Sequence, residues 1–575
     1  MWLLAALALI LLTFAHALPA DARSFVISRF DVQLTVTPDG ELLVTETVSP
    51  RFEGSWNGIQ RQIPVEYHTP QGFNYSLLLD HIEATDEQGA SLKVELSRDR
   101  HYRNIRVWIP GAVDATRTFI LKYRVRNGLK FFEEHDELYW NVTGDEWDVP
   151  IEHATARILL PTNTTGIRAL TFTGAYGARE HAATVEIAGP TVEMKMMRQL
   201  GFREGLTAVI GWDKGIVRGP TALEQSSQFA SANWPFAIPL VTLVGMLWLW
   251  YSRGRDPRLR TLTVAYEPPD RLTPAEVGTL IDESPDLRDI TATVVDLAVR
   301  GFLRIDVART EQMFGLWTST EYSFHRLKPS GEWESLPLHE QLILKGIFRH
   351  NNDEVPLSAL ENTFYSSLSG IQAAIFQQLQ QRHYYTRRPD LVKQAYLVGG
   401  FILGLVLTIG LGWWAGLQGM APLPALVAGP LSGLIVILVG RIMPARTLKG
   451  TRALEGIRGF EEFLTRVEGD RIERVVKTPE LFERFLPFAM ALGVEKNWAR
   501  AFESILTAPP SWYGGSNLSD FNSRSFLGQL DHMTRQTGST MTSAPRSSGG
   551  SGFSSGSSGG GSSGGGFGGG GGSGF

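Results

Sequence analysis

Residues 233–251 read NWPFAIPLVTLVGMLWLWY, and SRGRDPRLR comes immediately after them. The stretch contains no charged residue, and as an α-helix rising about 1.5 Å per residue it matches the thickness of a bilayer's hydrocarbon core. Aromatic rings stand at both ends, where such side chains favour the headgroup boundary. The pattern predicts a membrane-spanning helix. A buried core helix is the alternative, which the length and the flanks disfavour.

The charges after this span give its orientation, because basic flanks mark the cytoplasmic side of a membrane helix. Four arginines come after the span: Arg253, Arg255, Arg258 and Arg260. We therefore expect residues before 233 to lie outside the cytoplasmic membrane and those directly after 251 to lie inside.

Two further spans are predicted at 395–417 and 423–442, joined by the uncharged connection GLQGMAPLP. Basic residues precede the first and follow the second, so both outer flanks belong inside and the connection outside, in agreement with the first span. Neither span holds an Asp, Glu, Lys, Arg or His before its end, which disfavours an ion or proton path. The basic residues are Arg382, Arg387, Arg388 and Lys393 before the pair, and Arg441, Arg446, Lys449 and Arg452 at or after its end. Arg446, Lys449, Arg452 and Arg458 are also candidates for contact with anionic lipid; a role only as determinants of topology is the alternative.

Composition excludes several classes of function. The chain has 575 residues, enough for several domains, and a net charge of −5, so nothing points to nucleic acid as a partner. Cysteine is absent, which removes disulfides, thiolate metal sites and thiol catalysis. The histidines lie singly, without the spacing of metal ligands. We expect no metal, no cofactor and no catalytic residue that the sequence can identify.

Residues 1–22 open with MWLLAALALILLTFAHA and resemble a signal peptide in outline, although no Lys or Arg precedes the apolar run. An uncleaved anchor is the alternative, and either would export the residues after it. From 24 to 224, short runs alternate apolar and polar residues between Gly, Pro and Asn turns, as in Phe30, Val32 and Leu34. This pattern predicts an extracytoplasmic all-β sandwich.

Two stretches of this β domain stand out: GSWNGIQRQIP at 54–64 and ELYWNVTGDEWDVPI at 137–151. Seven acidic residues surround the second: Glu133, Glu134, Asp136, Glu137, Asp145, Glu146 and Asp148. They permit a Ca²⁺ site or a hydrolase carboxylate pair, but their spacing favours solvated loops around buried Tyr139, Trp140 and Trp147. We single out Arg61, Tyr139 and Trp140 as a possible binding face, because Arg, Tyr and Trp are favoured contact residues; burial in the core is the alternative.

Residues 252–393 are expected to form an inside α+β domain. A short strand at 261–264, helices at 272–281 and 289–300, and a hairpin at 302–307 and 321–325 have the order of a winged helix, with more helices at 336–348 and 364–384. The face of the second helix expected to be exposed carries Asp289, Thr293, Asp296 and Arg300. Such a face is hardly basic, so packing or protein contact is favoured over DNA binding.

A helical segment is predicted at 443–513, with an apolar stripe around Phe460 and Phe463. Glu461, Glu462 and Glu483 permit an acid–base or metal set, but neighbouring arginines favour ion-paired surface. Residues 514–575 are expected to be a disordered Gly/Ser-rich tail, because such composition buries too little apolar surface to fold. Its phenylalanines suggest contacts with a partner or the bilayer; a plain tether is the alternative.

Several stretches together resemble the predicted membrane proteins of the domain of unknown function 2207 family. They are WNGIQRQIP, ELYWNVTGDEWDVPI, PAEVGTLID, DLAVRGFLRI, MPARTLKGTRALEGIRGFEEFL, ELFERFLPFAMALGVEKNWARAF and PPSWYGG, with the Gly-rich tail after them. The resemblance covers nearly the whole chain. It implies a bacterial or archaeal envelope protein with this domain order, and it supplies no reaction and no catalytic residue.

The sequence therefore favours a multi-pass protein of the cytoplasmic membrane that serves as a scaffold or signal relay between the outside β domain and the inside helical modules. Its expected partners are the lipid bilayer and proteins on either face, with the C-terminus in the cytoplasm. An envelope hydrolase using the acids near 133–148 and a transporter accessory subunit are the alternatives.

Overall fold

The computed structural model describes residues 23–312, 317–349, 352–466, 477–515, 523–543 and 566–575. Contacts divide the chain into two compact units. Among the described residues, unit 1 holds 23–240, 404–431 and 566–575, and unit 2 holds 241–403 and 432–543. The predicted signal peptide at 1–22 lies outside the described residues.

The β domain of unit 1 is built on a seven-stranded sheet of order β14-β15-β12-β1-β2-β9-β6. The alternation predicted for β1 is present, because Phe30, Val32 and Leu34 are buried in the core. The strands are β1 (Ser24–Val36), β2 (Leu42–Glu53), β6 (Leu78–Asp86), β9 (Phe119–Arg126), β12 (Ala154–Leu159), β14 (Ala183–Ala188) and β15 (Thr191–Met196).

Two further sheets share the same core. One has the order β10-β11-β16-β13 and the other the order β22-β3-β8-β7. Their strands are β3 (Gly58–Pro64), β7 (Val94–Asp99), β8 (Tyr102–Trp108), β10 (Lys130–Phe131), β11 (His135–Asn141), β13 (Arg168–Ala175), β16 (Glu204–Asp213) and β22 (Gly571–Gly574). A small hairpin joins β4 (Glu66–His68) to β5 (Asn74–Ser76), and helix α2 (Ala222–Ala232) comes after the sheets.

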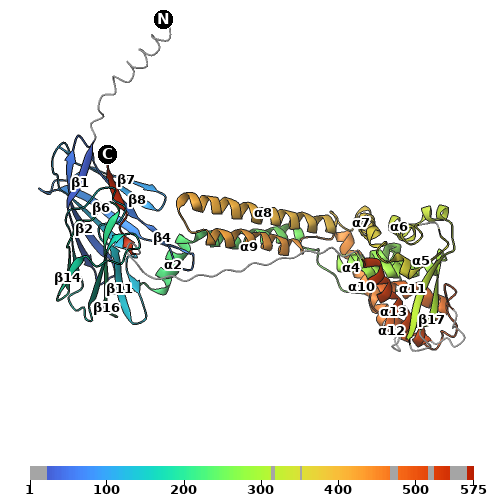
Figure 1. Ribbon diagram of the computed structural model, residues 1–575. Coiled ribbons are helices and arrows are strands. Elements are labelled where there is room, and N and C mark those ends of the chain that lie inside the picture. Colours follow the sequence, from blue (N-terminus) through green and yellow to red (C-terminus); the bar gives the residue numbers. More distant parts are fainter. Residues whose placement is uncertain (1–22, 313–316, 350–351, 467–476, 516–522, 544–565) are drawn as a thin grey trace, which may run out of the picture. The chain divides into compact units, whose positions relative to one another are not determined.

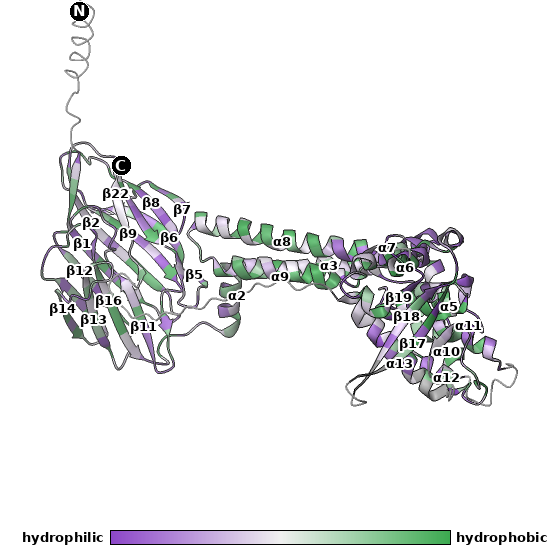
Figure 2. Cartoon of the chain, turned by 45° about the vertical axis from the view of Figure 1, so that its right-hand side comes forward, coloured by the Kyte–Doolittle hydropathy of each residue, from purple (hydrophilic) through white to green (hydrophobic). Residues whose placement is uncertain are grey.

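The three predicted spans appear as three apolar helices long enough to cross a membrane, at Trp234–Gly254, Pro389–Gln418 and Leu423–Gly440. The first contains α3 (Ala237–Leu249) and ends in a π-helical turn, Trp250–Gly254; the others are α8 and α9. Figure 2 shows α8 and α9 as mostly hydrophobic ribbons. Helices α8 and α9 approach closely at Gly429 of α9, because a Cβ added there would lie 2.2 Å from Thr408 Oγ1 of α8.

Unit 2 has an α+β core. Thr273 caps α4 through a capping box with Glu276, as the Thr-Pro start of the predicted helix suggests. The elements are α4 (Pro274–Asp282), α5 (Leu287–Val299), β17 (Leu303–Gln312), β18 (Trp317–Arg326), α6 (Leu338–Ile347), β19 (Glu354–Pro356) and α7 (Tyr365–Gln381). The later helices are α10 (Leu448–Arg466), α11 (Pro479–Ala491), α12 (Glu495–Arg500) and α13 (Ser523–Thr542), and β20 (Tyr513–Gly515) lies between α12 and α13.

Unit 2 corrects three expectations. Residues 261–264 form no strand; Ala265 N–H donates to Gly459 O at 3.1 Å, so this extended segment runs against α10 instead of beside a strand. Asp289 and Thr293 are buried, so the helix face expected to be exposed packs inward. The region 443–513 is no separate segment, because α10, α11 and α13 share one hydrophobic core with α4 to α7.

The tail expected to be disordered over 514–575 begins with Gly514 and Gly515 in β20 and contains two longer ordered parts; its residues 516–522 and 544–565 lie outside the described residues. Helix α13 packs Phe526, Leu530 and Met533 into the core of unit 2. Residues 566–575 form two short strands, β21 (Phe567–Gly568) and β22, within the β domain of unit 1. Figure 1 shows this red segment among the blue strands. Burial, which composition alone did not indicate, orders both parts.

Candidate peptide-binding groove

Residues 566–575, here called the glycine segment, lie between the edges of two sheets. On one side β22 pairs antiparallel with β3, with Gly572 opposite Arg61 and Gly574 opposite Ile59. On the other side β21 pairs parallel with β11, with Phe567 opposite Trp140. The segment thus adds a strand to each edge, which is a recurring way for a protein to hold a peptide.

Further backbone hydrogen bonds hold the segment beyond the paired strands. Glu146 N–H donates to Gly570 O at 3.0 Å, in the turn between β21 and β22. At the far end, Asn57 N–H donates to Phe575 O at 2.7 Å and Phe575 N–H donates to Gly58 O at 3.2 Å. Both distinctive stretches of the β domain, 54–64 and 137–151, therefore contact the glycine segment.

The edges of β3 and β11 that hold the glycine segment are here called the groove. Arg61 of β3 lies at its centre, and the Arg61 side chain is only 1% exposed. Its Nε donates to Glu46 at 2.9 Å, and its Nη1 donates to the carbonyls of Gly569 at 2.8 Å and Gly571 at 3.1 Å. Tyr123 OH also donates to Glu46, at 2.8 Å. Burial opposes the charge of Arg61, but the Glu46 carboxylate outweighs it and raises the pKa of the guanidinium. The buried, charged guanidinium of Arg61 therefore donates hydrogen bonds to two backbone carbonyls of the segment.

Aromatic side chains receive the two phenylalanines of the segment. The Phe567 ring stacks on Tyr75 with centroids 5.2 Å apart and meets Tyr67 edge-on at 5.1 Å. The Phe575 ring meets Trp108 edge-on at 5.1 Å, and the Arg106 guanidinium lies 5.4 Å from its centre. Both ends of the segment are thus anchored by ring contacts.

The middle of the segment requires glycine. Gly568, Gly569 and Gly570 have φ values of 70°, 85° and 74°, a left-handed conformation that other residues adopt only at a cost. A Cβ on Gly570 would lie 2.2 Å from Gln62 O, and one on Gly569 would lie 2.5 Å from Asn141 Nδ2. Ser573, in contrast, is exposed. The groove therefore accepts the pattern Phe-Gly-Gly-Gly-Gly-Gly-X-Gly-Phe.

The structure brings Arg61, Tyr139 and Trp140, the residues singled out from the sequence, against the glycine segment. Trp140 is buried and pairs with Phe567, and a Cβ on Gly566 would lie 2.6 Å from the Tyr139 ring. The contributions of Glu46 and Tyr123 were missed. Their sequence signal is weak, since a single Glu in an apolar strand and a single Tyr identify no partner.

Four of the seven acidic residues around 137–151 bind other side chains of the β domain. Asp136 is buried and binds Lys214 at 3.2 Å, Glu146 accepts from Tyr102 OH at 2.8 Å, and Asp148 binds Arg203 at 3.1 Å. Asp145 accepts from Asn141 at 2.8 Å, and burial raises the pKa of its carboxyl. Within the described part of the chain, no group of three or more His, Asp or Glu residues could hold a metal ion.

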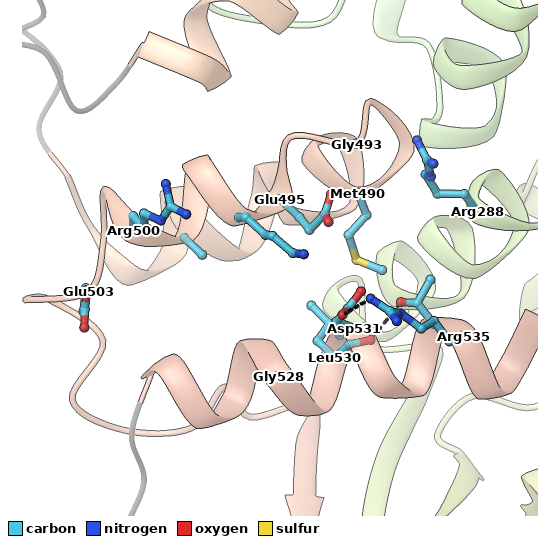
Figure 3. A pocket seen from close by; sticks show the side chains of 13 residues that line it. Arg288, Met490, Gly493, Glu495, Arg500, Glu503, Gly528, Leu530, Asp531 and Arg535 are labelled. Carbon is cyan, nitrogen blue, oxygen red and sulfur yellow. Dashed lines mark hydrogen bonds and ion pairs between the residues drawn. The ribbon is translucent and has the colours of Figure 1, made fainter.

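A cavity of about 720 Å³ in unit 2 lies beside α11, α12 and α13. Figure 3 shows the side chains that line it, with Arg535 paired to Asp531 at 2.8 Å. Charges of both signs line this cavity: Arg288, Lys496, Arg500 and Arg535, with Glu495, Glu503 and Asp531. This mixture favours no single class of ligand.

Unit 2 also buries an acidic side chain, Glu340, which is 0% exposed and pairs with Arg300. Burial raises the pKa of Glu340 to about 7, although Arg300 acts in the opposite direction. Because the native state binds this proton more tightly than the unfolded state, its stability falls as the pH rises from about 4.5 to about 7.

We therefore expect the chain to lose thermal stability between pH 5 and pH 8 relative to a Glu340→Gln variant, by about 3 kcal/mol at most. Melting curves of both proteins in detergent across this range measure the difference. Glu334→Gln, at an exposed position, is the matched control and should behave as the unchanged chain does. Parallel curves for the chain and Glu340→Gln would contradict the prediction.

Comparisons with known proteins agree with this architecture. The model of the N-terminal domain of the predicted membrane protein family DUF2207 matches residues 26–212, and that of its C-terminal domain matches 263–502. The uncharacterized protein YciQ of Escherichia coli K12 is 25% identical over 357 residues, 58% of this chain. The match spans 53% of YciQ, about half of that relative's length.

Solved structures resemble the chain only distantly. Leukotriene A4 hydrolase from Saccharomyces cerevisiae is 10% identical, with a TM-score of 0.22 over 32% of this chain and 29% of that one. An M1 zinc metallopeptidase from Deinococcus radiodurans is 11% identical, with a TM-score of 0.19 over 32% and 42%. At these TM-scores the likeness supports no inference. The two family models cover most of the sequence, one for each folded region, and the chain therefore belongs to the DUF2207 family of predicted membrane proteins.

Proposed function

We propose that this protein is a transmembrane scaffold or relay whose outside β domain binds a glycine-rich peptide segment. The observation that carries the proposal is the seating of residues 566–575 between β3 and β11, with the buried Arg61 bound to two of its carbonyls. The specificity comes from backbone pairing, two aromatic anchors and a turn that only glycine fills.

The three apolar helices and their basic flanks support the orientation, with the β domain outside the cytoplasmic membrane and 252–393 inside. A second support lies within unit 1, where the turn between α8 and α9 contacts the β domain. Ala421 N–H donates to Asn74 Oδ1 at 2.6 Å, and His68 Nε2 lies 3.0 Å from Gly419 O. This turn and the β domain therefore belong on one side of the membrane.

The inside module of the proposed relay has the order α4, α5 and then the β17–β18 hairpin. This order supports a winged-helix-like arrangement, and the buried face of α5 supports packing in place of DNA contact. Protein partners on the inside are accordingly favoured over nucleic acid.

Arg446 supports a connection between the spans and this module. Its side chain, expected from the sequence to face lipid or mark topology, is 7% exposed and binds Asp256 at 2.6 Å and Glu283 at 2.7 Å. It also donates to the Leu280 carbonyl at 2.8 Å. One side chain thus joins the segment after the first span, the end of α4 and the turn after the third span.

A peptide-binding measurement tests the proposal. We expect the protein lacking 566–575, held in detergent, to bind the synthetic peptide GFGGGGGSGF, and a peptide with Gly570→Ala to bind roughly 30-fold more weakly. The loss has two causes, the left-handed φ at this position and the 2.2 Å approach of a Cβ to Gln62 O. Fluorescence anisotropy of labelled peptides gives both affinities.

The control peptide carries Ser573→Ala, a change at an exposed position of the same segment, and should bind as the natural peptide does. If the Gly570→Ala peptide bound equally well, the groove would not select its ligand in the way that the structure indicates.

A further inference from the structure

We infer that in the membrane the groove is filled by a glycine-rich segment of another polypeptide on the β domain's side, not by residues 566–575 of the same chain. This inference rests on the proposed function and names the source of the ligand. Its basis is the number of times the chain crosses the bilayer between the groove and the glycine segment.

The α+β core of unit 2 lies on a single side of the membrane, because one hydrophobic core joins its helices and strands. Ile290 of α5, Phe460 of α10 and Met541 of α13 all belong to this core. The helices α4 to α7 and α10 to α13, which all contribute to this core, must therefore share a side.

The β domain lies on the other side. Trp234–Gly254 leads from the β domain into unit 2, α8 leads back to the turn that Asn74 contacts, and α9 returns to unit 2. Three crossings separate the groove from Ser543, the last described residue before the glycine segment. An odd number of crossings leaves the two on opposite sides.

The connection between Ser543 and Gly566 is unsuited to a fourth crossing. Residues 544–565 read APRSSGGSGFSSGSSGGGSSGG, with one phenylalanine and no apolar run. A span needs roughly 20 apolar residues, and a Gly/Ser backbone in hydrocarbon would leave polar groups unsatisfied. In a sealed membrane the chain's own glycine segment therefore stays on the side of unit 2.

The groove itself needs an occupant on its own side. Without one, Arg61 Nη1 would keep only the Gln62 carbonyl, at 3.3 Å, and the outer edges of β3 and β11 would lose their paired strands. The contacts define the occupant's chemistry: a glycine run between two aromatic residues, with one tolerant position before the last glycine. The chain's own segment shows this pattern and fills the groove where no bilayer intervenes.

Peptide binding to the full chain in two settings tests the inference. In detergent, the tethered segment competes at an effective concentration on the order of millimolar, so deleting 566–575 should raise GFGGGGGSGF affinity at least about tenfold. In sealed vesicles with the β domain outward, the deletion should change nothing, because the groove is already open. A deletion effect in vesicles as large as in detergent would overturn the inference.

Cysteine labelling locates the segment directly, because the chain has no cysteine of its own. An impermeant maleimide added outside should label Ser97→Cys and spare Ser330→Cys and Ser573→Cys. Ser573 is exposed within the groove, so protection there cannot result from binding. Labelling of Ser573→Cys would overturn the inference and leave the proposed function standing, whereas peptide binding in neither setting would contradict the proposed function itself.

Discussion

Replacing Arg61 by methionine is expected to weaken binding of the glycine peptide at least roughly 100-fold, since two charge-assisted hydrogen bonds to its carbonyls disappear. The same change leaves Glu46 buried without its cation. Breaking a buried ion pair in this way costs about 3–5 kcal/mol of stability. The Arg61→Met variant should therefore both melt earlier and fail to bind.

A compensated variant separates these two effects. Arg61→Met combined with Glu46→Leu and Tyr123→Phe removes the whole buried polar group, and replacing such a group by apolar side chains is often neutral for stability. We expect its melting temperature to approach that of the unchanged chain while peptide binding stays lost. Recovery of binding in this variant would show that Arg61 serves the stability of the β domain and not recognition.

The second large effect is a loss of thermal stability, which we expect in the Arg446→Met variant. The change removes the cation that pairs with Asp256 and Glu283, whose side chains are 35% and 22% exposed, and leaves the Leu280 carbonyl without this donor. We expect unit 2 to lose about 2–3 kcal/mol, less than for a fully buried pair because both carboxylates keep contact with water; for a unit of this size the loss lowers the melting temperature by roughly 5–10 °C. Thermal unfolding in detergent, monitored by tryptophan fluorescence, measures the shift.

Arg452→Met is the matched control, because Arg452 comes after the same span, carries the same charge and is exposed. Its melting temperature should change by no more than about a degree or two. Equal shifts in melting temperature for the two variants would mean that the basic flank acts only through its charge at the membrane. This outcome would contradict the proposed connection through Arg446.

Much of the fold can be predicted from local pattern in the sequence. The three spans are predicted by uncharged apolar runs, β1 by strict alternation, and the start of α4 by Thr273 and Pro274, and the structure places helices or strands at each. These features need no knowledge of the rest of the chain, because the bilayer, the pleat and the helix end each impose a short-range rule.

Other features depend on residues far apart in sequence. The strand predicted at 261–264 has suitable residues, but its backbone lies against α10, so the extended segment pairs with no strand. The buried face of α5 could not be read from its own polarity, because Asp289 turns inward to accept from the Asp286 N–H at 3.0 Å. The single core of unit 2 likewise joins segments on either side of a helical hairpin.

The candidate site shows the same division. Residue type was enough to single out Arg61, Tyr139 and Trp140 in the sequence. It did not predict that these residues contact the glycine segment. A glycine run carries no side-chain pattern, so composition predicts disorder, and only the groove imposes its left-handed turn. The sequence by itself therefore determined the three helices that are long and apolar enough to cross a membrane and the alternation of β1. The tertiary structure decided where Arg446 and the glycine segment lie, because burial and backbone pairing depend on partners far away in the sequence.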